Sequence, residues 1–458
     1  MAPSLDWVST QELTLTSEDY SLLTDLYQLT MAACYTGEGV EQKWASFELF
    51  TRRLPDDFGY LIAMGLAQAL EYLENLHFTP TQISALKATK IFTHAPETFW
   101  TLLELGHFTG DVWAVPEGTA VFANEPLLRV EAPLWQAQLI ETYLLNTLNF
   151  QTLVATRAAR IRDIAGPSAI LLEFGTRRAF SPQSSLWAAR AALAAGLDST
   201  SNVLAALRLG SQPSGTMAHS LVMAIAAMEG TEDQAFTAFH RYFPGAPLLI
   251  DTYDTVAAAQ RLAKKVQAGE MQLAGVRLDS GDLATLSQQV RSLLPEVKIF
   301  ASGDLDEWEI ARLKANKAEI DGYGLGTRLV TGTPVNGVYK IVEIEGIPVM
   351  KQSSGKATYP GRKQVFRRYA GNRVIKDSLG LMTETDAQPL LQLVMQQGKR
   401  LQPPDTLAQI RDRTTRSVAS LPDTVRRLDN PISLPVEISP ALQQLTEHSR
   451  GQGLGVSS

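Results

Sequence analysis

Five short apolar runs between residues 169 and 323 constrain the fold of this 458-residue chain more than any other feature. Each run is typical of a buried strand, ends in polar or glycine residues, and is in most cases followed by a helix-like segment. The positions that follow the last four runs, Asp251, Asp279, Ser302 and Thr327, lie 28, 23 and 25 residues apart. This rhythm indicates successive β-α units with a parallel sheet, either a (β/α) barrel or an open doubly wound sheet.

The polar residues at the strand ends favour the barrel. A barrel gathers the carboxyl ends of all its strands around one mouth, whereas an open sheet concentrates ligand contacts at one switch point. Because at least five strand ends carry polar groups, the sequence predicts an α/β fold with an irregular (β/α) barrel. An additional α+β domain, built from the N-terminal part and from segments after the barrel, is expected to accompany it.

Length and pattern together suggest the domain boundaries, since about 150 residues per domain gives two or three domains. Residues 1–165 are expected to form the N-terminal α+β domain, and residues 166–342 the barrel-like catalytic domain. Residues 343–458 are expected to form a C-terminal segment, partly packed on the N-terminal domain and ending in a polar tail.

Composition narrows the class of protein. The chain is 45% hydrophobic and carries a net charge of −7, which argues against nucleic acid or an anionic membrane as the main partner. Cys34 is the only cysteine, so an internal disulfide and a cysteine-based zinc cage are excluded. The N-terminus does not read as a signal peptide, and no run approaches the ~18 apolar residues of a membrane span. We therefore expect a soluble, cytoplasmic protein that acts on small molecules.

His219 is the histidine best placed for chemistry. It follows a turn-prone stretch and precedes the apolar, helix-like run 221–228, so it is expected at the exposed mouth of a helix. The alternative is an ordinary helix start, with Ser214 or Thr216 as the capping residue and His219 as a polar residue of the first turn.

Carboxylates and arginines gather at the predicted strand ends. Asp279 and Asp282 lie beside Arg277, and Asp251 and Asp254 follow the preceding strand. Carboxylates at a barrel mouth suit Mg²⁺, a ribose diol or a cationic transition state, although Asp254 and Asp282 could equally cap the helices that follow. Guanidinium groups and glycine-rich turns suggest a phosphate cradle formed by Arg177, Arg178, Arg277, Arg328, Gly303 and residues 324–326.

Taken together, these segments resemble the nicotinate phosphoribosyltransferase family, in the same order along the chain. The resemblance covers roughly residues 20–370 and rests on residues 22–31, 173–178, 198–203, 215–220, 249–255, 275–283, 301–304, 323–331 and 351–367. Eight or more ordered motifs are far more specific than any one of them, and no Walker A or dinucleotide fingerprint competes with them. One departure is the turn at 180–185, where relatives often carry more glycine and aspartate.

The resemblance implies roles for individual residues. His219 matches the histidine that the family phosphorylates from ATP, and it is expected to be catalytic together with Asp279 and Arg277. Phe174 matches the residue on which the pyridine ring stacks, while Tyr27 matches one that closes over the ring from a neighbouring subunit. The remaining expected nicotinate contacts are Thr216, Arg277 and Ser201. The expected phosphoribosyl and phosphate contacts are Arg177, Asp279, Gly303, Asp304, Gly326 and Thr327.

The implied activity is ATP-stimulated transfer of phosphoribose from 5-phosphoribosyl 1-pyrophosphate to nicotinate, a ligase-type reaction of NAD biosynthesis. Mg²⁺ is the expected cofactor, with its ligands left open, and ATP the co-substrate. A homodimer with shared active sites is expected, without nucleic-acid or membrane partners. The physics agrees, because bond cleavage at C1 of the ribose builds positive charge that Asp279 could stabilise, and a neutral His219 can accept a phosphoryl group.

Alternatives remain within and outside this family. Nicotinamide phosphoribosyltransferase resembles the same pattern but has an aspartate where this chain has Ser201; a serine suits a carboxylate substrate better. Quinolinate phosphoribosyltransferase fits less well, because chains of that family are usually much shorter. A catalytically silent regulatory protein would have no chemical need for His219, Arg277 and Asp279 together. A barrel aldolase or isomerase lacks a candidate here, because no lysine stands at a strand end.

Overall fold

The computed structural model describes residues 13–352 and 358–453. The chain divides into two compact units, each described by itself below. The first comprises Met1–Leu153, Pro334–Thr406 and Ala419–Ser458, and the second comprises Val154–Thr333 and Leu407–Val418. The division falls inside helix α6 (Glu141–Ala165) and not after residue 165, and it assigns part of the C-terminal segment to the barrel unit. Residues 353–357 of the 351–367 motif and the last five residues of the predicted polar tail lie outside the described residues.

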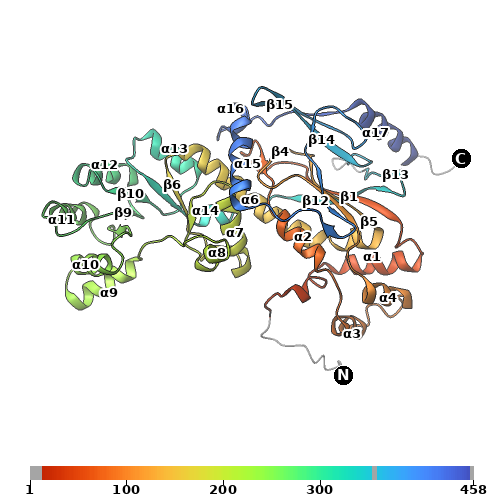
Figure 1. The fold of residues 1–458 in the computed structure, drawn as a ribbon, viewed down its shortest axis with the longest axis horizontal. Helices are drawn as coiled ribbons and strands as arrows, with labels where there is room; N and C mark the ends of the chain where they lie inside the picture. Colours follow the sequence, from red (N-terminus) through yellow and green to blue (C-terminus); the bar gives the residue numbers. More distant parts are fainter. Residues whose placement is uncertain (1–12, 353–357, 454–458) are drawn as a thin grey trace. The chain divides into compact units, whose positions relative to one another are not determined.

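The second unit is built on a six-stranded, wholly parallel sheet (Figure 1). Its strands, in spatial order, are β7 (Ser199–Thr200), β6 (Ile170–Glu173), β11 (Gly322–Leu325), β10 (Lys298–Ala301), β9 (Gly275–Leu278) and β8 (Leu248–Leu249). Among the six strands of this sheet, β6 comes first and β11 last along the chain, yet the two are paired. The strands therefore follow one another in chain order around a ring that is open only between β7 and β8. This arrangement confirms the predicted irregular (β/α) barrel, and β7 is a strand that the apolar pattern did not reveal.

Helices follow the strands of this unit, as the β-α rhythm predicts. They are α7 (Pro182–Ala194), α8 (Val203–Arg208), α9 (His219–Glu229), α10 (Glu232–Tyr242), α11 (Thr255–Gln267), α12 (Leu283–Leu293), α13 (Glu307–Ala315), α14 (Thr327–Val330) and most of α15 (Leu407–Ser420). Figure 1 shows α11 and α12 along the outside of β9 and β10. Helix α15 joins the unit because Arg411 donates to the Asp198 carboxylate at 2.6 Å and to the carbonyl of Leu197 at 2.9 Å.

The first unit is α+β and is assembled from distant parts of the chain. Its seven-stranded sheet runs β13 (Ile347–Pro348), β12 (Gly337–Ile344), β1 (Trp44–Thr51), β5 (Pro126–Pro133), β3 (Asp111–Ala114), β17 (Gln392–Gln396) and β18 (Lys399–Arg400). A second sheet runs β16 (Gln388–Pro389), β14 (Lys363–Ala370), β15 (Arg373–Leu381) and β19 (Val436–Ile438), and β2 (Leu61–Ile62) pairs with β4 (Ala120–Val121). Because β1 pairs with both β5 and β12, the expectation of a domain built from N-terminal and later segments is confirmed.

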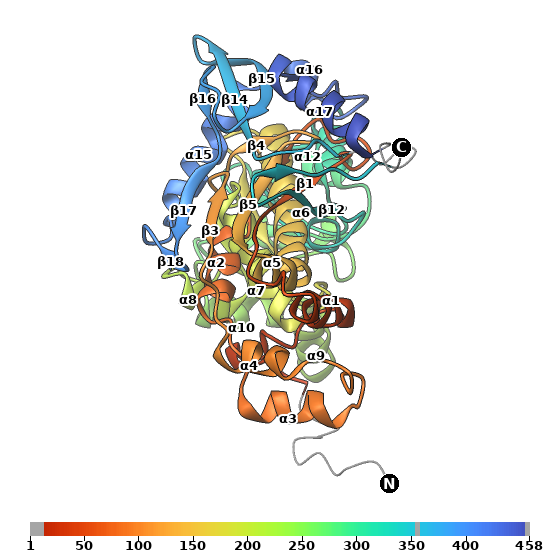
Figure 2. The same cartoon turned by 90° about the vertical axis from the view of Figure 1, so that its right-hand side faces the viewer.

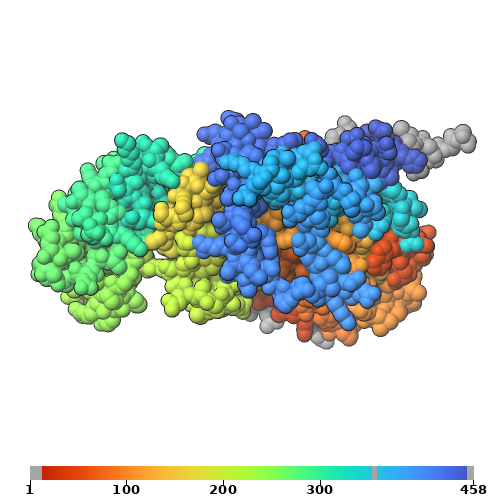
Figure 3. Space-filling model, turned by 45° about the horizontal axis from the view of Figure 1, so that its top comes forward, coloured from red at the N-terminus to blue at the C-terminus, as the bar shows by residue number. Residues whose placement is uncertain are grey.

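Short helices complete the first unit (Figure 2). They are η1 (Ser17–Asp19), α1 (Leu26–Gly37), α2 (Leu66–Glu74), α3 (Pro80–Ala88), α4 (Glu97–Leu105), α5 (Leu134–Leu139), α16 (Asp423–Arg426) and α17 (Pro440–Gly453). Helix α17 contacts β15, and Figure 3 shows the C-terminal part of this unit, in blue, at the surface. No helix of the described chain is long and apolar enough to cross a membrane.

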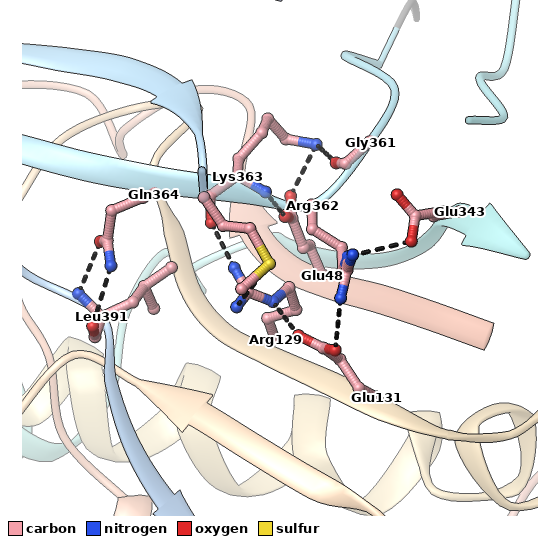
Figure 4. Close-up of polar contacts among 10 residues, drawn as sticks. Glu48, Arg129, Glu131, Glu343, Gly361, Arg362, Lys363, Gln364 and Leu391 are labelled. Carbon is pink, nitrogen blue, oxygen red and sulfur yellow. Dashed lines mark hydrogen bonds and ion pairs between the residues drawn. The ribbon is translucent and has the colours of Figure 1, made fainter. Parts of the chain in front are cut away.

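A largely buried network of three acids and three bases, with Arg362 and Glu343 at its partly exposed end, fastens the start of β14 to the large sheet (Figure 4). The ammonium of Lys363 lies 2.8 Å from Glu48 and donates to the carbonyls of Tyr359 and Gly361. The guanidinium of Arg129 donates to Glu131 at 2.8 Å. One more base and one more acid complete the network. A guanidinium nitrogen of Arg362 lies 3.1 Å from the carboxylate of Glu131, and another lies 2.9 Å from the carboxylate of Glu343. Each charge has an opposite partner, so the network holds the segment before β14 without an unpaired buried charge.

Candidate active site

The predicted site residues other than Tyr27 all lie in the barrel unit. Most follow a strand directly or within a few residues: Phe174 and Arg177 after β6, Ser201 after β7, Asp279 after β9, Gly303 and Asp304 after β10, and Gly326 and Thr327 after β11. Arg277 is the third residue of β9, and Thr216 and His219 belong to the segment that leads into α9. Because the strands are parallel, their carboxyl ends share one edge of the sheet, where active sites of such folds are built.

Helix α9 begins at His219, as the sequence predicts. Its N-cap is Ala218, which makes no side-chain capping bond, so neither Ser214 nor Thr216 caps the helix. The imidazole remains 39% exposed. Its Nδ1 lies 3.0 Å from the hydroxyl of Thr252, and its Nε2 lies 3.9 Å from Oδ1 of Asp251. A histidine held by neighbours on two sides and open on a third is suited to accepting a phosphoryl group.

Asp251 and Asp279 form a linked pair at the ends of β8 and β9. The Oδ2 atom of Asp251 accepts from the backbone N–H of Asp279 at 2.9 Å and from the hydroxyl of Ser280 at 2.7 Å. Its Oδ1 atom is buried and has no hydrogen-bond partner. The carboxylate of Asp279 accepts from the hydroxyl of Ser302. Asp251, which the sequence placed at a strand end among the candidate carboxylates without giving it a role of its own, thus lies beside both Asp279 and His219.

The two neighbouring aspartates have a different role. The carboxylate of Asp254 accepts from the backbone N–H of Ala257 at 2.9 Å and caps α11, and Asp282 caps α12 through Thr285. These bonds lower the pKa of Asp282 below its ordinary value. The capping alternative therefore holds for Asp254 and Asp282, and Asp251 and Asp279 are left for chemistry.

Gly303 allows a close approach of backbone to the Asp279 turn. Its φ of 97° lies in the left-handed region, and a Cβ there would collide with the carbonyl oxygen of Asp279. Asp304 follows with a φ of 48°, also left-handed. Two consecutive residues of this kind curl the backbone after β10 into the turn that the sequence assigns to the ribose phosphate.

The arginines of the predicted phosphate cradle differ in their partners. Arg277 is largely buried and donates to the carbonyl of Met217 at 2.8 Å, while its Nε has no partner. Burial lowers the pKa of Arg277, and the carboxylates of Asp279 and Asp251 act in the opposite direction. Arg177 is exposed. Arg328 is also exposed, but one of its guanidinium nitrogens lies 2.6 Å from Asp306, the N-cap of α13, so this arginine is paired with a carboxylate of the fold.

Backbone hydrogen bonds to the ends of β11 and β6 hold Phe174 and Ser201, two of the residues expected to contact the pyridine. Phe174 is half-buried, its N–H donates to the carbonyl of Leu325 at 2.7 Å, and its ring lies against Gly324, where a Cβ would collide with it. The guanidinium carbon of Arg277 lies 6.0 Å from the centroid of this ring. The N–H of Ser201 donates to the carbonyl of Glu173 at 2.9 Å, and Thr216 is half-buried nearby along the chain before α9. A flat ring and a cationic group therefore share one part of the edge.

Tyr27 lies in the other unit, in the first turn of α1. Its hydroxyl donates to Glu141 at 3.1 Å, and its side chain is 47% exposed. Burial of the hydroxyl, with a smaller effect of Glu141, raises the pKa of Tyr27 to about 12. An exposed ring with an anchored hydroxyl is free to contact another molecule.

No group of three or more His, Cys, Asp or Glu residues in the described part of the chain is arranged to hold a metal ion. Magnesium is commonly bound by one or two carboxylates together with substrate phosphates and water. Asp251 and Asp279 provide such carboxylates, and the unpartnered Oδ1 of Asp251 is an oxygen of the kind this ion prefers.

Comparison with known proteins identifies the family. Three family models match: the nicotinate phosphoribosyltransferase N-terminal domain at residues 22–149, the nicotinate phosphoribosyltransferase family at 170–301, and its C-terminal domain at 376–446. A nicotinate phosphoribosyltransferase of Mycobacterium tuberculosis is 40% identical over 92% of this chain and 91% of its own. The Bacillus subtilis enzyme is 44% identical over 76% and 73%, and the human enzyme 34% identical over 93% and 95%.

Solved structures agree with the sequence comparison. The crystal structure of human nicotinic acid phosphoribosyltransferase has a TM-score of 0.82 and 31% identity, and the match covers 93% of this chain and 99% of that one. Nicotinate-nucleotide pyrophosphorylase from Pyrococcus furiosus has a TM-score of 0.73 and 25% identity, over 90% and 99%. On these matches in sequence and in fold, the chain belongs to the nicotinate phosphoribosyltransferase family.

Proposed function

We propose that this chain transfers the phosphoribosyl group of 5-phosphoribosyl 1-pyrophosphate to nicotinate, forming nicotinate mononucleotide and pyrophosphate for NAD biosynthesis. The relatives that match this chain over most of their own length are named nicotinate phosphoribosyltransferases. Within the molecule, the observation that carries the proposal is the shared carboxyl edge of one parallel sheet, where Phe174 follows β6 and Asp279 follows β9. The guanidinium carbon of Arg277, in β9, lies 6.0 Å from the centroid of the Phe174 ring.

In this reaction the bond from C1 of the ribose to a pyrophosphate oxygen breaks, and its electron pair leaves with pyrophosphate. The lone pair of the pyridine nitrogen forms the new bond to C1, so no proton has to be removed. Positive charge develops on the sugar, and the carboxylate of Asp279, held by Ser302, stabilises it. The enzyme must mainly position the two reactants, which the fixed strand ends favour.

Nicotinate is held by its ring and by its carboxylate. The pyridine stacks on Phe174, and Arg277, with Thr216, provides cationic and polar contacts to the carboxylate. Ser201 presents a neutral hydroxyl, which tolerates the negative charge that an aspartate at this position would repel. The anion would stabilise the charged form of Arg277, which burial makes costly.

The phosphoribosyl group lies along the turns after β10 and β11. Gly303, Asp304, Gly326 and Thr327 provide backbone and hydroxyl groups, and Arg177 provides an exposed guanidinium for a phosphate. Asp279 and Asp251 are the residues that would hold Mg²⁺. The ion would supply neutralising charge for the leaving pyrophosphate.

ATP stimulation is proposed to act through His219. Phosphoryl transfer from ATP would form a bond between phosphorus and an imidazole nitrogen and release ADP, and water would later hydrolyse this bond to phosphate. Asp251 and Thr252 would orient the ring, since they face its two nitrogens.

A homodimer with shared active sites completes the proposal, with Tyr27 of one copy closing over the pyridine of the other. It is supported by the exposed ring of Tyr27 and by its anchored hydroxyl. Mixing Tyr27→Ala with Asp279→Asn protein tests it. Recovery of activity in the mixture, beyond that of either variant, is expected for shared sites, whereas a simple average would contradict them.

The activity itself is tested by measuring pyrophosphate release with phosphoribosyl pyrophosphate and Mg²⁺, with and without ATP. Nicotinate is expected to give turnover that ATP increases. A preference for nicotinamide over nicotinate would contradict the assigned substrate, and turnover without any effect of ATP would contradict the coupling alone.

A further inference from the structure

Glu173, the last residue of β6, is a buried carboxylate at the centre of the strand-end edge. Glu173 is 0% exposed. One carboxylate oxygen accepts from the backbone N–H of Gly175, and the other accepts from the hydroxyl of Thr200 at the end of β7. Its backbone carbonyl also accepts from the N–H of Ser201 at 2.9 Å. Glu173 therefore ties the end of β6 to the end of β7 by two hydrogen bonds, and a third bond, from Gly175, fixes the turn that follows β6.

This carboxylate has no cation to compensate its charge. Burial raises the pKa of Glu173, the bonds from Thr200 and Gly175 lower it, and no Arg or Lys of the described chain contributes. A buried acid held only by neutral donors costs stability compared with an apolar side chain of similar size. Its presence at a strand end is therefore better explained by what the bonds hold in place than by stability.

The bonds hold the segments that carry the pyridine contacts. Gly175 directly follows Phe174, and its own Cβ position is filled by Val330 and by the Glu173 carboxylate, so the turn is fixed on both sides. Thr200 directly precedes Ser201, and its carbonyl accepts from the N–H of Ser214 at 2.9 Å, two residues before Thr216. All three segments meet at the Glu173–Thr200 pair.

We infer that Glu173, acting with Thr200, is a positioning residue for the pyridine: it sets the separation of Phe174 from Ser201 and Thr216. The inference rests on the proposed function, in which these three residues contact nicotinate. Glu173 itself is too buried to touch a ligand, so its effect is on the geometry of the pocket. The turns after β10 and β11, which would hold the phosphoribosyl group, receive no bond from its carboxylate.

The donors explain why a carboxylate is needed. An N–H and a hydroxyl both point at it, and the hydroxyl of Thr200 already accepts from the N–H of Asn202 at 2.9 Å. Glutamine has nearly the same shape, but its NH₂ group would face the Thr200 hydroxyl and leave the hydroxyl hydrogen without an acceptor. Valine in place of Thr200 removes the donor at nearly constant volume, whereas serine keeps it.

The test compares Glu173→Gln, Thr200→Val, Thr200→Ser and the double variant Glu173→Gln/Thr200→Val, each assayed for kcat, both KM values and Tm. Glu173→Gln and Thr200→Val are expected to raise KM for nicotinate by about tenfold, a typical effect of one buried hydrogen bond. KM for phosphoribosyl pyrophosphate should stay within about twofold of wild type on the same reasoning. Thr200→Ser should behave as wild type, and the double variant should be no worse than the worse single one.

Other outcomes would overturn the inference. These are a lower Tm with both KM values unchanged, a parallel rise of both KM values, or Thr200→Ser behaving like Thr200→Val. Glu232→Gln is the matched control, since Glu232 is a buried acid of the same unit that pairs with Arg261 and makes no bond to Glu173, Thr200 or the segments that they hold. If Glu173→Gln fails to fold, the Val and Ser variants of Thr200 decide. If wild type does not turn over nicotinate, the proposed function fails, and calorimetric binding of nicotinate to the same variants judges Glu173 separately.

Discussion

His219 faces the carboxylate of Asp251, with 3.9 Å between its Nε2 and an Oδ1 atom that has no hydrogen-bond partner. The other nitrogen lies 3.0 Å from the hydroxyl of Thr252. The imidazole thus has a hydroxyl partner at one nitrogen and lies beside a buried carboxylate, beyond hydrogen-bonding distance, at the other. In the proposed function, these two groups orient the imidazole for phosphoryl transfer from ATP.

Replacing His219 should separate phosphoribosyl transfer from its stimulation by ATP. His219→Ala is expected to retain phosphoribosyl transfer and to lose its stimulation by ATP, since the phosphoryl acceptor is gone while Asp279 and Phe174 remain. Initial rates with and without ATP check this, with His94→Ala as the control because His94 is an exposed histidine of the other unit. Equal stimulation in wild type and His219→Ala would remove the histidine from the coupling.

Two aspartates three positions apart should respond in opposite ways. Asp279→Asn is expected to lower kcat on the order of 10²–10³-fold with an unchanged Tm, because it removes the charge that stabilises the sugar cation. Asp282→Asn should leave kcat unchanged and cost only a little stability, because Asp282 caps α12 and is exposed. Similar kcat values for the two variants would show that Asp279 does not act on the sugar.

Gly303→Ala should impair the site through the backbone. The left-handed φ and the close carbonyl of Asp279 are expected to cost about 1–3 kcal/mol, and any relief by movement displaces the Asp279 turn. A higher KM for phosphoribosyl pyrophosphate and a lower Tm should be seen together. Gly245→Ala is the control, since no heavy atom lies within 4 Å of its Cβ position. Wild-type kinetics in Gly303→Ala would contradict the close approach.

Ser201 should control the choice between the acid and the amide. Ser201→Asp places a negative charge near the expected carboxylate of nicotinate and is expected to raise its KM on the order of tenfold by like-charge repulsion. Nicotinamide, with N–H donors, should suffer less. Ser201→Ala distinguishes loss of the hydroxyl from gain of the charge. If the Ser201→Asp and Ser201→Ala variants show the same preference between nicotinate and nicotinamide, charge at this position does not determine the choice of substrate.

The buried Glu173 should leave a signature in stability against pH. Its pKa is raised in the folded state, so the native state gains from it below the ordinary glutamate range and loses that gain as pH rises through the folded value. The stability of Glu173→Gln relative to wild type should therefore increase from acidic to neutral pH. Urea unfolding of both proteins at several pH values measures it, and a difference that does not change with pH would mean that Glu173 has an ordinary pKa when folded.

The sequence by itself determined the β-α rhythm, the edge at which polar residues collect and the position of His219 at the start of α9. These features are local: a buried parallel strand is an apolar run, and its end is marked by the change to polar residues. The ordered motifs added the family and, through it, the residues of the site. Strand β7 escaped because its two residues, Ser199 and Thr200, are polar and carry no apolar pattern.

Only the tertiary structure decided how these polar residues are used. The sequence left Asp282 open between capping and chemistry and placed Arg277 and Arg328 in one predicted cradle; in the structure Asp282 caps α12, and Arg328 forms an ion pair with Asp306, which lies 22 residues away along the chain. Asp251 and Thr252 became partners of His219 through the pairing of β8 with β9 and the placement of α9. Glu173 likewise looked like a strand residue until its carboxylate was seen between Gly175 and Thr200. Hydrogen bonds between residues tens of positions apart are set by packing, and no local pattern in the chain encodes them.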